Sequence, residues 1–255
     1  MKLFVLGCGT STGVPRIGND WGACDPKDAR NRRTRVSIIV ESDGGERVLV
    51  DTSPDLRHQL LAANIDRIDA VCWTHDHADH CHGIDDLRAL RYGRGGPIPA
   101  YGTEETVRRL RQRFGYVFAG QHGYSTICNI ETLDRLKLLC GMRLSWCRMP
   151  HGPAQSTAYR FDAAGKSIGY ATDFSEIRND LVDLFTNLDV LVVDCLRREP
   201  HPTHAHLSMS LDLAAQTQSK RVILTHLDKS MDYTSLVEET PSHVYPAYDG
   251  MVIAL

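Results

Sequence analysis

The sequence has no long apolar run. No stretch approaches the roughly 18 consecutive apolar residues that a membrane-spanning helix needs. The opening segment, MKLFVLGCGT, holds one lysine and an apolar core that is too short for a secretory signal peptide. We therefore expect a cytoplasmic protein with no membrane partner.

An excess of positive charge is also missing. There are 29 lysines and arginines against 32 aspartates and glutamates, which gives a formal net charge of −3. Proteins that bind large nucleic acids through the phosphate backbone usually carry a basic surface, so we expect no such partner. Arginines do gather locally. Residues 108–113 fit the solvated face of a helix, whereas residues 30–35 precede an apolar strand and could line an anion pocket.

The eight cysteines include no C-x-x-C pair. Several lie in apolar runs, such as AVCWT and LVVDCL, where a buried thiol is typical. Reduced cysteines of this kind are typical of a cytoplasmic protein rather than of a disulfide-linked secreted one.

What the sequence does contain is short β-branched runs and helical periodicity, with 42% hydrophobic and 24% charged residues. No repeat or linker divides the chain, so we expect one domain over residues 1–255. A tight DGG at Asp43–Gly45 predicts a hairpin. The pattern favours an α/β fold in which sheets pack face to face and helices cover the outside. The expected strands span residues 2–6, 36–41, 47–50, 70–74, 143–148, 158–162, 167–171, 190–194 and 221–225, and the expected helices span residues 54–64, 104–114, 174–188 and 207–218.

Polar residues stand at the ends of several expected strands. Loops at one edge of a β-core are where a rigid scaffold presents functional groups, so this pattern indicates a functional site at that edge. The residues concerned are Asp51, His75, His151, Asp173, Asp194 and His226.

The segment THDHADHCHG, which spans residues 74–83, carries the strongest chemical signal. His75 and His77 leave the expected strand at a spacing of two and can project to one side, while Asp79 and His80 stand at the expected start of a helical turn. Neutral imidazoles and carboxylates are ligands for zinc, manganese or iron. Three histidines and an aspartate exceed what one tetrahedral ion takes from so short a loop. The segment therefore predicts a two-metal site that is completed by more distant ligands.

The candidates that complete this site are the strand-end residues His151, Asp173 and His226. His82 lies outside the spacing of the other histidines, and we expect it to be a partly exposed helical residue.

The same segment resembles the signature of the metallo-β-lactamase superfamily. LVDTSPD, PHG, ATDF and LTH, at residues 49–55, 150–152, 171–174 and 224–226, match the other motifs of that superfamily in order. The resemblance implies a four-layer αββα sandwich with two divalent metals at one edge, and Asp51 as a residue that orients the metal loop through hydrogen bonds. It further implies that His75, His77 and His151 hold one metal, that Asp79, His80 and His226 hold the other, and that Asp173 bridges them.

The segment REPHPTHAHLSMSLDLAAQ, residues 198–216, places three histidines before an expected helix. A histidine there could protonate a departing alkoxide, because its pKa lies near neutral. Together with GCGTSTGVP, RNRRTRVS and AYDGM, the segment resembles the phosphodiesterase branch of the superfamily, and most of all the phosphoribosyl cyclic-phosphate phosphodiesterases of phosphonate breakdown. In that family the catalytic histidine lies 22 residues before the last metal ligand, which implies His204 as general acid. His206 is the second choice and His201 the third.

Two further expectations concern the surroundings of the site. Arg35 or Arg197 could hold a phosphate group. The phosphodiesterase family often carries a cysteine cluster that binds a separate structural zinc, but Asn19, Trp21 and Lys229 stand here where three of its ligands would be. One remaining cysteine cannot build a tetrahedral site, so we expect no separate structural zinc and a loop held by packing of Trp21.

The leading hypothesis is therefore a metal-dependent phosphodiesterase with Asp79 and His204 as catalytic residues. A hydroxide activated by the two metals would hydrolyse a small cyclic phosphate or a nucleotide-like phosphodiester. A tRNA 3′-processing ribonuclease is less favoured because no long basic arm is visible, and a thioester hydrolase would leave residues 198–206 unexplained. A nucleotide- or metal-binding protein without turnover is the non-enzymatic alternative. The sequence does not decide between zinc, manganese and iron, nor whether the chain forms a homodimer.

Overall fold

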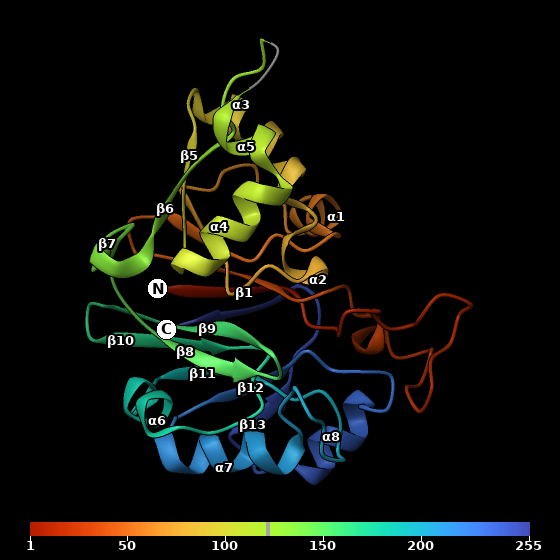
Figure 1. Ribbon diagram of the computed structural model, residues 1–255. Coiled ribbons are helices and arrows are strands. Elements are labelled where there is room, and N and C mark those ends of the chain that lie inside the picture. The colour runs from red at the N-terminus through yellow and green to blue at the C-terminus, as the bar shows by residue number, and fades with distance from the viewer. Residues whose placement is uncertain (121–122) are drawn as a thin grey trace.

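The computed structural model describes residues 1–120 and 123–255, which are arranged in four layers (Figure 1). Two seven-stranded sheets face each other, and helices cover the outer face of each sheet, which confirms the expected αββα sandwich. The first sheet has the order β14-β1-β2-β3-β4-β5-β6, with β1 Lys2–Gly7, β2 Ser37–Glu41, β3 Arg47–Val50, β4 Ala70–Cys72, β5 Ile98–Gly102, β6 Cys128–Thr132 and β14 Met251–Ala254. The second has the order β13-β12-β11-β10-β9-β8-β7, with β7 Leu138–Leu139, β8 Met142–His151, β9 Ala154–Ala163, β10 Lys166–Ala171, β11 Val190–Asp194, β12 Val222–Thr225 and β13 Val244–Pro246.

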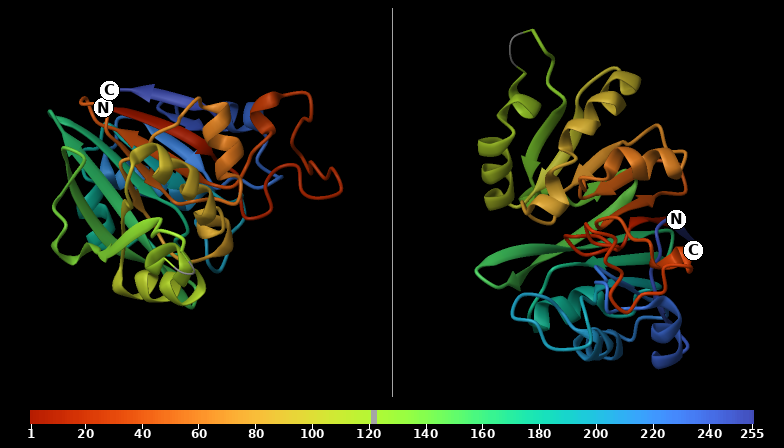
Figure 2. Two further views of the ribbon diagram at one scale, coloured as in Figure 1. Left: turned by 90° about the horizontal axis from the view of Figure 1, so that it is seen from above. Right: turned by 90° about the vertical axis from the view of Figure 1, so that its right-hand side faces the viewer.

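The helices fall into two groups, one on each outer face (Figures 1 and 2). Over the first sheet lie α1 Leu56–Ala62, α2 Ala78–Cys81, α3 Leu87–Arg94, α4 Glu104–Arg113 and α5 Gly115–Ala119. Over the second sheet lie α6 Asn179–Phe185, α7 Leu207–Thr217 and α8 Tyr233–Glu239.

The apolar core has three layers, because both faces of each sheet are covered. Strand β3 shows how the sequence produces this arrangement. Val48 and Val50 point into the layer between the sheets, whereas Leu49 points into the layer beneath the helices. Side chains of a strand alternate between its two faces, so a strand that is covered on both sides reads as a continuous apolar run.

The strands that lead into the polar residues end at one edge of the sandwich. Strand β3 is parallel to β4, and β10, β11 and β12 are parallel to one another. Strand β8 runs in the same direction as β10, because each of them is antiparallel to β9. The residues that follow these strands are thus brought to a common edge.

The expected helix at residues 174–188 begins only at Asn179. The preceding residues form a loop, in which Asp173 has a φ of +60° and Ser175 donates its backbone N–H to the carbonyl of Pro150. The sequence also did not predict β5, β6, β7, β13 and β14, nor the helices α3, α5 and α8. Strand β5 contains a proline and ends on a glycine, two residues that ordinarily argue against a central strand.

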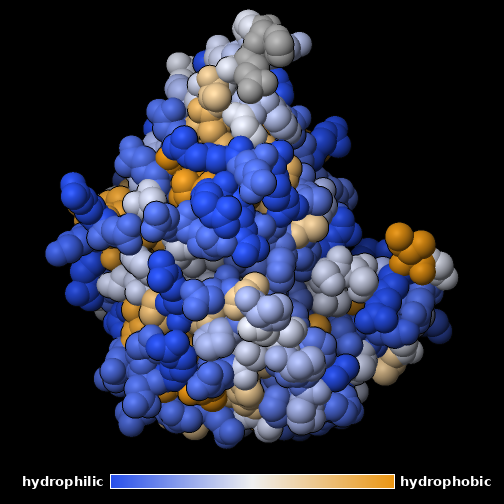
Figure 3. Space-filling view, in the orientation of Figure 1, coloured by the Kyte–Doolittle hydropathy of each residue, from blue (hydrophilic) through white to orange (hydrophobic). Residues whose placement is uncertain are grey.

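Within the described part of the chain, no helix is long and apolar enough to cross a membrane. The face seen in Figure 3 is covered mainly by hydrophilic residues, with apolar side chains scattered among them.

Two glycines on different elements provide a matched test of the packing. A Cβ at Gly169 in β10 would lie 2.3 Å from Cδ1 of the buried Leu188, whereas a Cβ at Gly93 in α3 meets nothing within 4 Å. We expect Gly169→Ala to lower the free energy of unfolding by about 1–3 kcal/mol through overpacking. Gly93→Ala should raise it by about 0.5–1 kcal/mol through a lower backbone entropy of the unfolded chain. Urea unfolding midpoints measure both changes, and an unchanged midpoint for Gly169→Ala would contradict this account of the core.

Candidate metal centre

Seven side chains converge at the edge where the strands end. Four come from the segment between β4 and the end of α2 on the first sheet. On the second sheet, His151 is the last residue of β8, and Asp173 and His226 follow β10 and β12. The structure therefore brings together all of the residues that the sequence predicted as ligands: His75, His77, Asp79, His80, His151, Asp173 and His226.

The seven residues form two groups, and within each group the ligand atoms lie within 4.8 Å of one another. A further group of this kind joins Asp173 and His226 to His204. One group contains His75, His77, His151 and Asp173, and the other contains Asp79, His80 and His226.

The carboxylate of Asp173 lies between the two groups. Its Oδ2 is 3.5 Å from Nε2 of His151 and 3.8 Å from Nε2 of His75. Its Oδ1 is 3.3 Å from Nε2 of His80 and 3.6 Å from Nε2 of His226. Ligand atoms at about 2.1 Å from a tetrahedral ion are separated by about 3.4 Å, so these distances suit a carboxylate shared by two ions.

The ring nitrogens of the cluster fit a metal because several of them lack another partner. Nε2 of His75, of His80 and of His226 are buried and have no hydrogen-bond partner among the described residues. An unpaired buried polar atom costs about 1–3 kcal/mol, and a bound cation would remove that cost. Burial lowers the pKa of His75 well below its usual range, so its ring carries the free lone pair that a metal needs. Neutral imidazoles together with carboxylates suit zinc, manganese or iron.

The negative charge of Asp173 also favours the binding of metal ions. Burial would raise the pKa of its carboxyl group, but the neighbouring His226 and His80 outweigh burial and hold the pKa well below its usual range. The carboxylate is therefore ionised beside these two histidines, and, against the effect of burial, it raises their pKa values in turn, to about 9 for His226. Both rings would release a proton when an ion binds.

Hydrogen bonds on the far side of the rings turn two of these histidines toward the cluster. Nδ1 of His80 donates to Asp51 at 2.7 Å, and Asp51 also accepts from the backbone N–H and the hydroxyl of Thr74, each at 2.8 Å. Nδ1 of His151 donates to the carbonyl of Thr203 at 2.7 Å. Such contacts fix the tautomer and leave Nε2 free for a metal. Asp51 thus makes the hydrogen bonds to the metal loop that its motif implies.

Three residues at this edge have a left-handed backbone, which the sequence did not predict. Asp51, Asp173 and His226 have φ values of +65°, +60° and +58°, and each directly follows a strand or stands one residue beyond it. Non-glycine residues rarely adopt this region, and it is concentrated at functional sites. The side chains of Asp173 and His226 belong to the cluster, and that of Asp51 contacts His80 within it.

His204 lies beside the cluster, and a buried carboxylate orients it. Its Nδ1 is 3.1 Å from Oδ2 of Asp194, and its ring stacks on His226 with 4.7 Å between the ring centres. Asp194 is fully buried and also accepts the backbone N–H of Asp173 at 3.0 Å. Because Nδ1 of His204 is bound to Asp194, its Nε2 is the atom that remains to exchange a proton.

The sequence analysis counted Asp194, at the end of the apolar run VLVVD, among the strand-end residues of the expected site, but it gave this residue no specific role. The other two histidines of the segment lie outside the metal-ligand groups found in the described chain. His201 accepts from the backbone N–H of Thr203 at 3.3 Å, and His206 is the N-cap residue of α7. His82 is exposed at the end of α2, as expected.

The two arginines considered for phosphate binding already have protein partners. Nε of Arg35 lies 3.0 Å from the carboxylate of Asp55. Arg197 donates to the carbonyls of Glu199 and Pro200, at 3.2 and 2.8 Å. These contacts give no support to a phosphate-binding role for either side chain.

The loop at residues 16–24 is held by polar contacts as well as by the expected packing of Trp21. Trp21 is only partly buried, and its Nε1 donates to Oδ1 of Asn19 within the same loop at 3.0 Å. The loop is joined to the rest of the chain by Lys229, which pairs with Asp20 and accepts the backbone N–H of Ala23 at 2.9 Å. The indole also packs against Arg32, whose guanidinium carbon lies 5.0 Å from the ring centre, so Trp21 contributes a packing contact beside those of Lys229. The lack of a structural zinc stays a prediction.

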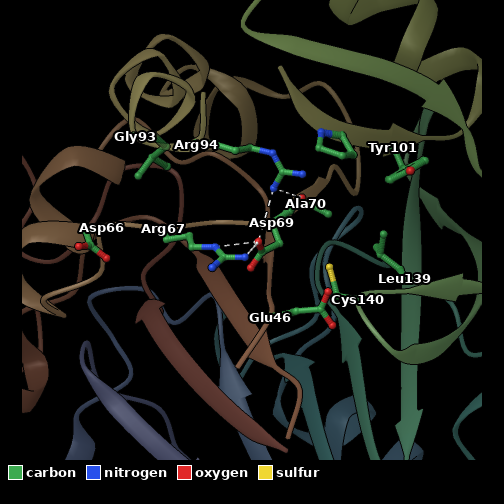
Figure 4. Close-up of a pocket in the computed structure, with 12 residues that line it drawn as sticks. Glu46, Asp66, Arg67, Asp69, Ala70, Gly93, Arg94, Tyr101, Leu139 and Cys140 are labelled. Carbon is green, nitrogen blue, oxygen red and sulfur yellow. Dashed lines mark hydrogen bonds and ion pairs between the residues drawn. The ribbon is translucent and has the colours of Figure 1, made fainter. Parts of the chain in front are cut away.

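A cavity of about 780 Å³ opens at the opposite edge of the sandwich (Figure 4). Its floor holds Asp69, whose carboxylate is paired with Arg67 at 2.6 Å and Arg94 at 3.4 Å. Glu46 precedes β3 and Ala70 begins β4, so the cavity lies at the ends of these strands remote from Asp51 and His75. It is therefore separate from the metal-ligand cluster.

Residues 46–227 match the family model described as the beta-lactamase superfamily domain. The chain belongs to the beta-lactamase superfamily. The match covers more than half of the chain and includes all seven candidate ligands, so the superfamily expected from the sequence motifs is confirmed.

Among solved structures of this superfamily, a diphosphatase of the PhnP family is similar over 100% of this chain and 97% of its own, with 36% identity and a TM-score of 0.89. This similarity confirms the resemblance to the phosphodiesterase branch. Among curated relatives, an octanoyltransferase of Porphyromonas gingivalis is 31% identical over 98% of this chain, and a ribonuclease Z of Kineococcus radiotolerans is 30% identical over 54% of it. The chain spans about half the length of each curated relative, 51% and 46%.

Proposed function

We propose that this chain is a metal-dependent phosphodiesterase that acts on a small phosphodiester. One arrangement carries the proposal. The carboxylate of Asp173 lies between the two ligand groups, and the ring of His204 is oriented beside them. The similarity to a PhnP-family diphosphatase over nearly the full length of both chains supports the same class of reaction.

The roles of the residues follow from their contacts. Divalent ions held by the seven ligands would acidify a water molecule to near-neutral pKa and offset charge on the phosphoryl oxygens. His204 donates the proton that the leaving oxygen needs, and Asp194 holds Nδ1 so that the donating atom is Nε2. Asp51 and the carbonyl of Thr203 keep His80 and His151 turned toward the ions.

Two substrate classes fit this arrangement. A cyclic phosphate or a nucleotide-like diester leaves an alkoxide, which requires the proton from His204. A diphosphate leaves a phosphate group, which requires it less, and the similar PhnP-family diphosphatase favours this second class. The ribonuclease Z relative matches only 54% of this chain, so RNA processing has less support.

The first test combines metal content with hydrolysis. We expect two divalent ions per chain by elemental analysis, and chelation should abolish hydrolysis of bis(nitrophenyl) phosphate, with recovery on addition of zinc or manganese. His80→Ala should lose metal and activity, whereas His58→Ala, on the exposed surface of α1, is the matched control and should keep both. A protein that binds two ions and cleaves thioesters, but no phosphodiester or diphosphate, would overturn the proposal.

The substrate class is then decided by a panel. It contains 2′,3′-cyclic nucleotides, a phosphoribosyl cyclic phosphate, a dinucleotide joined by a diphosphate and a tRNA precursor. A preference for the tRNA precursor would transfer the assignment to the ribonuclease class.

A further inference from the structure

Asp76 stands between the candidate ligands His75 and His77, and its side chain is engaged by helix α4. Oδ2 of Asp76 lies 3.1 Å from Nη1 of Arg113, and Oδ1 lies 3.4 Å from Nη1 of Arg109. The carboxylate is mostly buried, with an exposed fraction of 15%. Because neighbouring residues of an extended segment point to opposite sides, the two histidines face the metal-ligand cluster while Asp76 faces the helix.

The backbone of Asp76 is held as well. Its carbonyl accepts a hydrogen bond from Nη1 of Arg113 and another from the thiol of Cys81 at 3.2 Å. Nη2 of Arg113 lies 2.6 Å from Nε2 of His82, at the end of α2. One guanidinium thus bridges Asp76 and His82, the residues that stand before and after the ligands His77, Asp79 and His80 in the chain.

Helix α4 is a firm support for these contacts. Its N-cap Thr103 accepts from the backbone N–H of Thr106, and Val107 and Leu110 are buried against the first sheet. Arg109 and Arg113 are four residues apart and lie on one face of the helix. The sequence interpretation of residues 108–113 as a solvated face holds for Arg108, whose side chain is 60% exposed. It holds in part for Arg109 and Arg113, whose side chains are 43% and 36% exposed while their guanidinium groups contact Asp76.

We propose that Arg113, with Arg109 and Asp76, forms a clamp that positions His75 and His77 for metal binding. None of the three is a ligand in either group, so they are positioning residues that act through the two histidines. The inference rests on the proposed function and deepens it. It states that helix α4, which supplies no ligand, sets the spacing of two ligands in the group that also contains His151 and Asp173.

The test measures metal binding without substrate. Arg113→Gln removes the guanidinium, and Arg108→Gln is the matched control on the same helix, because Arg108 contacts Glu105 and not Asp76. We expect the dissociation constant of Co²⁺ or Zn²⁺ at one of the two sites, determined by competition with a chromophoric chelator, to rise about 10–100-fold in Arg113→Gln. The control should stay within twofold of the wild type. The visible spectrum of the Co²⁺-loaded protein should change in Arg113→Gln only.

Two more variants separate positioning from folding. Arg113→Lys keeps a donor for the carbonyl of Asp76 and should recover part of the affinity. Asp76→Asn keeps that carbonyl and removes only the charge of the side chain, so it tests the clamp if Arg113→Gln does not fold. The metal-free Arg113→Gln protein should still unfold in one cooperative thermal transition, with a lower midpoint than Arg108→Gln because Arg113 makes more contacts.

Wild-type affinity and an unaltered Co²⁺ spectrum in both Arg113→Gln and Asp76→Asn would overturn the clamp and leave the phosphodiesterase proposal intact. Weakened metal binding in a protein that cleaves no phosphodiester or diphosphate would instead support the clamp and overturn the proposed function.

Discussion

Asp173→Asn is expected to reduce phosphodiester hydrolysis by at least about a thousandfold. The carboxylate faces both ligand groups, at 3.3 Å from His80 and 3.5 Å from His151, so its replacement by a neutral amide weakens both sides of the centre. Charge stabilisation by bound metals contributes several kcal/mol to such reactions, and each 1.36 kcal/mol is about tenfold in rate. Steady-state rates and the metal content of the purified variant measure the effect.

Asp183→Asn is the matched control for this change, because Asp183 is an exposed aspartate on α6. It should retain wild-type metal content and rate. If Asp173→Asn kept two ions and more than a tenth of the activity, Asp173 would not bridge the centre, and the two groups would have to be treated as independent sites.

His204→Ala should show an effect that depends on the leaving group. With an alkyl phosphodiester or a cyclic phosphate, the rate should fall by about 10²–10⁴-fold, the usual contribution of general acid catalysis. With a nitrophenyl diester the loss should be less than about tenfold, because nitrophenolate is a stable anion that departs without a proton. The ratio of kcat/KM values for the two substrates, in wild type and variant, is the quantity to measure.

Substitutions of three residues near His204 test the same assignment. Asp194→Asn should reproduce part of the loss on the alkyl substrate, since Oδ2 of Asp194 accepts from Nδ1 of His204. His201→Ala and His206→Ala should alter the two substrates equally or not at all. An equal loss on both substrates in His204→Ala would show that this residue binds substrate or supports the loop, and does not protonate the leaving oxygen.

The sequence identified the residues whose side chains are metal-ligand types and which either crowd one short segment or stand at the ends of strands. His75, His77, Asp79 and His80 are visible because imidazoles and a carboxylate crowd one short segment after an apolar strand. The more distant ligands are visible because parallel strands bring their ends to one edge, whatever their separation in the chain. The layered fold follows from runs such as RVLV, which need cover on both faces.

The other features of the site depend on contacts between side chains, and these contacts cannot be predicted from the spacing of residues in the sequence. Asp194 reads as the end of a buried strand, and only the folded chain shows that its carboxylate meets His204. Arg108 and Arg113 look alike in the sequence, yet only Arg113 reaches Asp76 across the gap between α4 and the metal loop. The late start of α6 is likewise hidden from a helical apolar pattern, because Ser175 donates its backbone N–H to the carbonyl of Pro150 in a loop before Asn179.

The distribution of the seven ligands over the two sheets has a consequence for assembly of the fold. Residues 75–80 belong to the first half of the chain, and His151, Asp173 and His226 belong to the second. Ions held between them would act as a removable cross-link that fastens one half of the sandwich to the other. A ligand that binds only the folded chain stabilises it by about 4 kcal/mol at a thousand times its dissociation constant. The supply of free metal would thereby set how tightly the two halves of the sandwich stay closed.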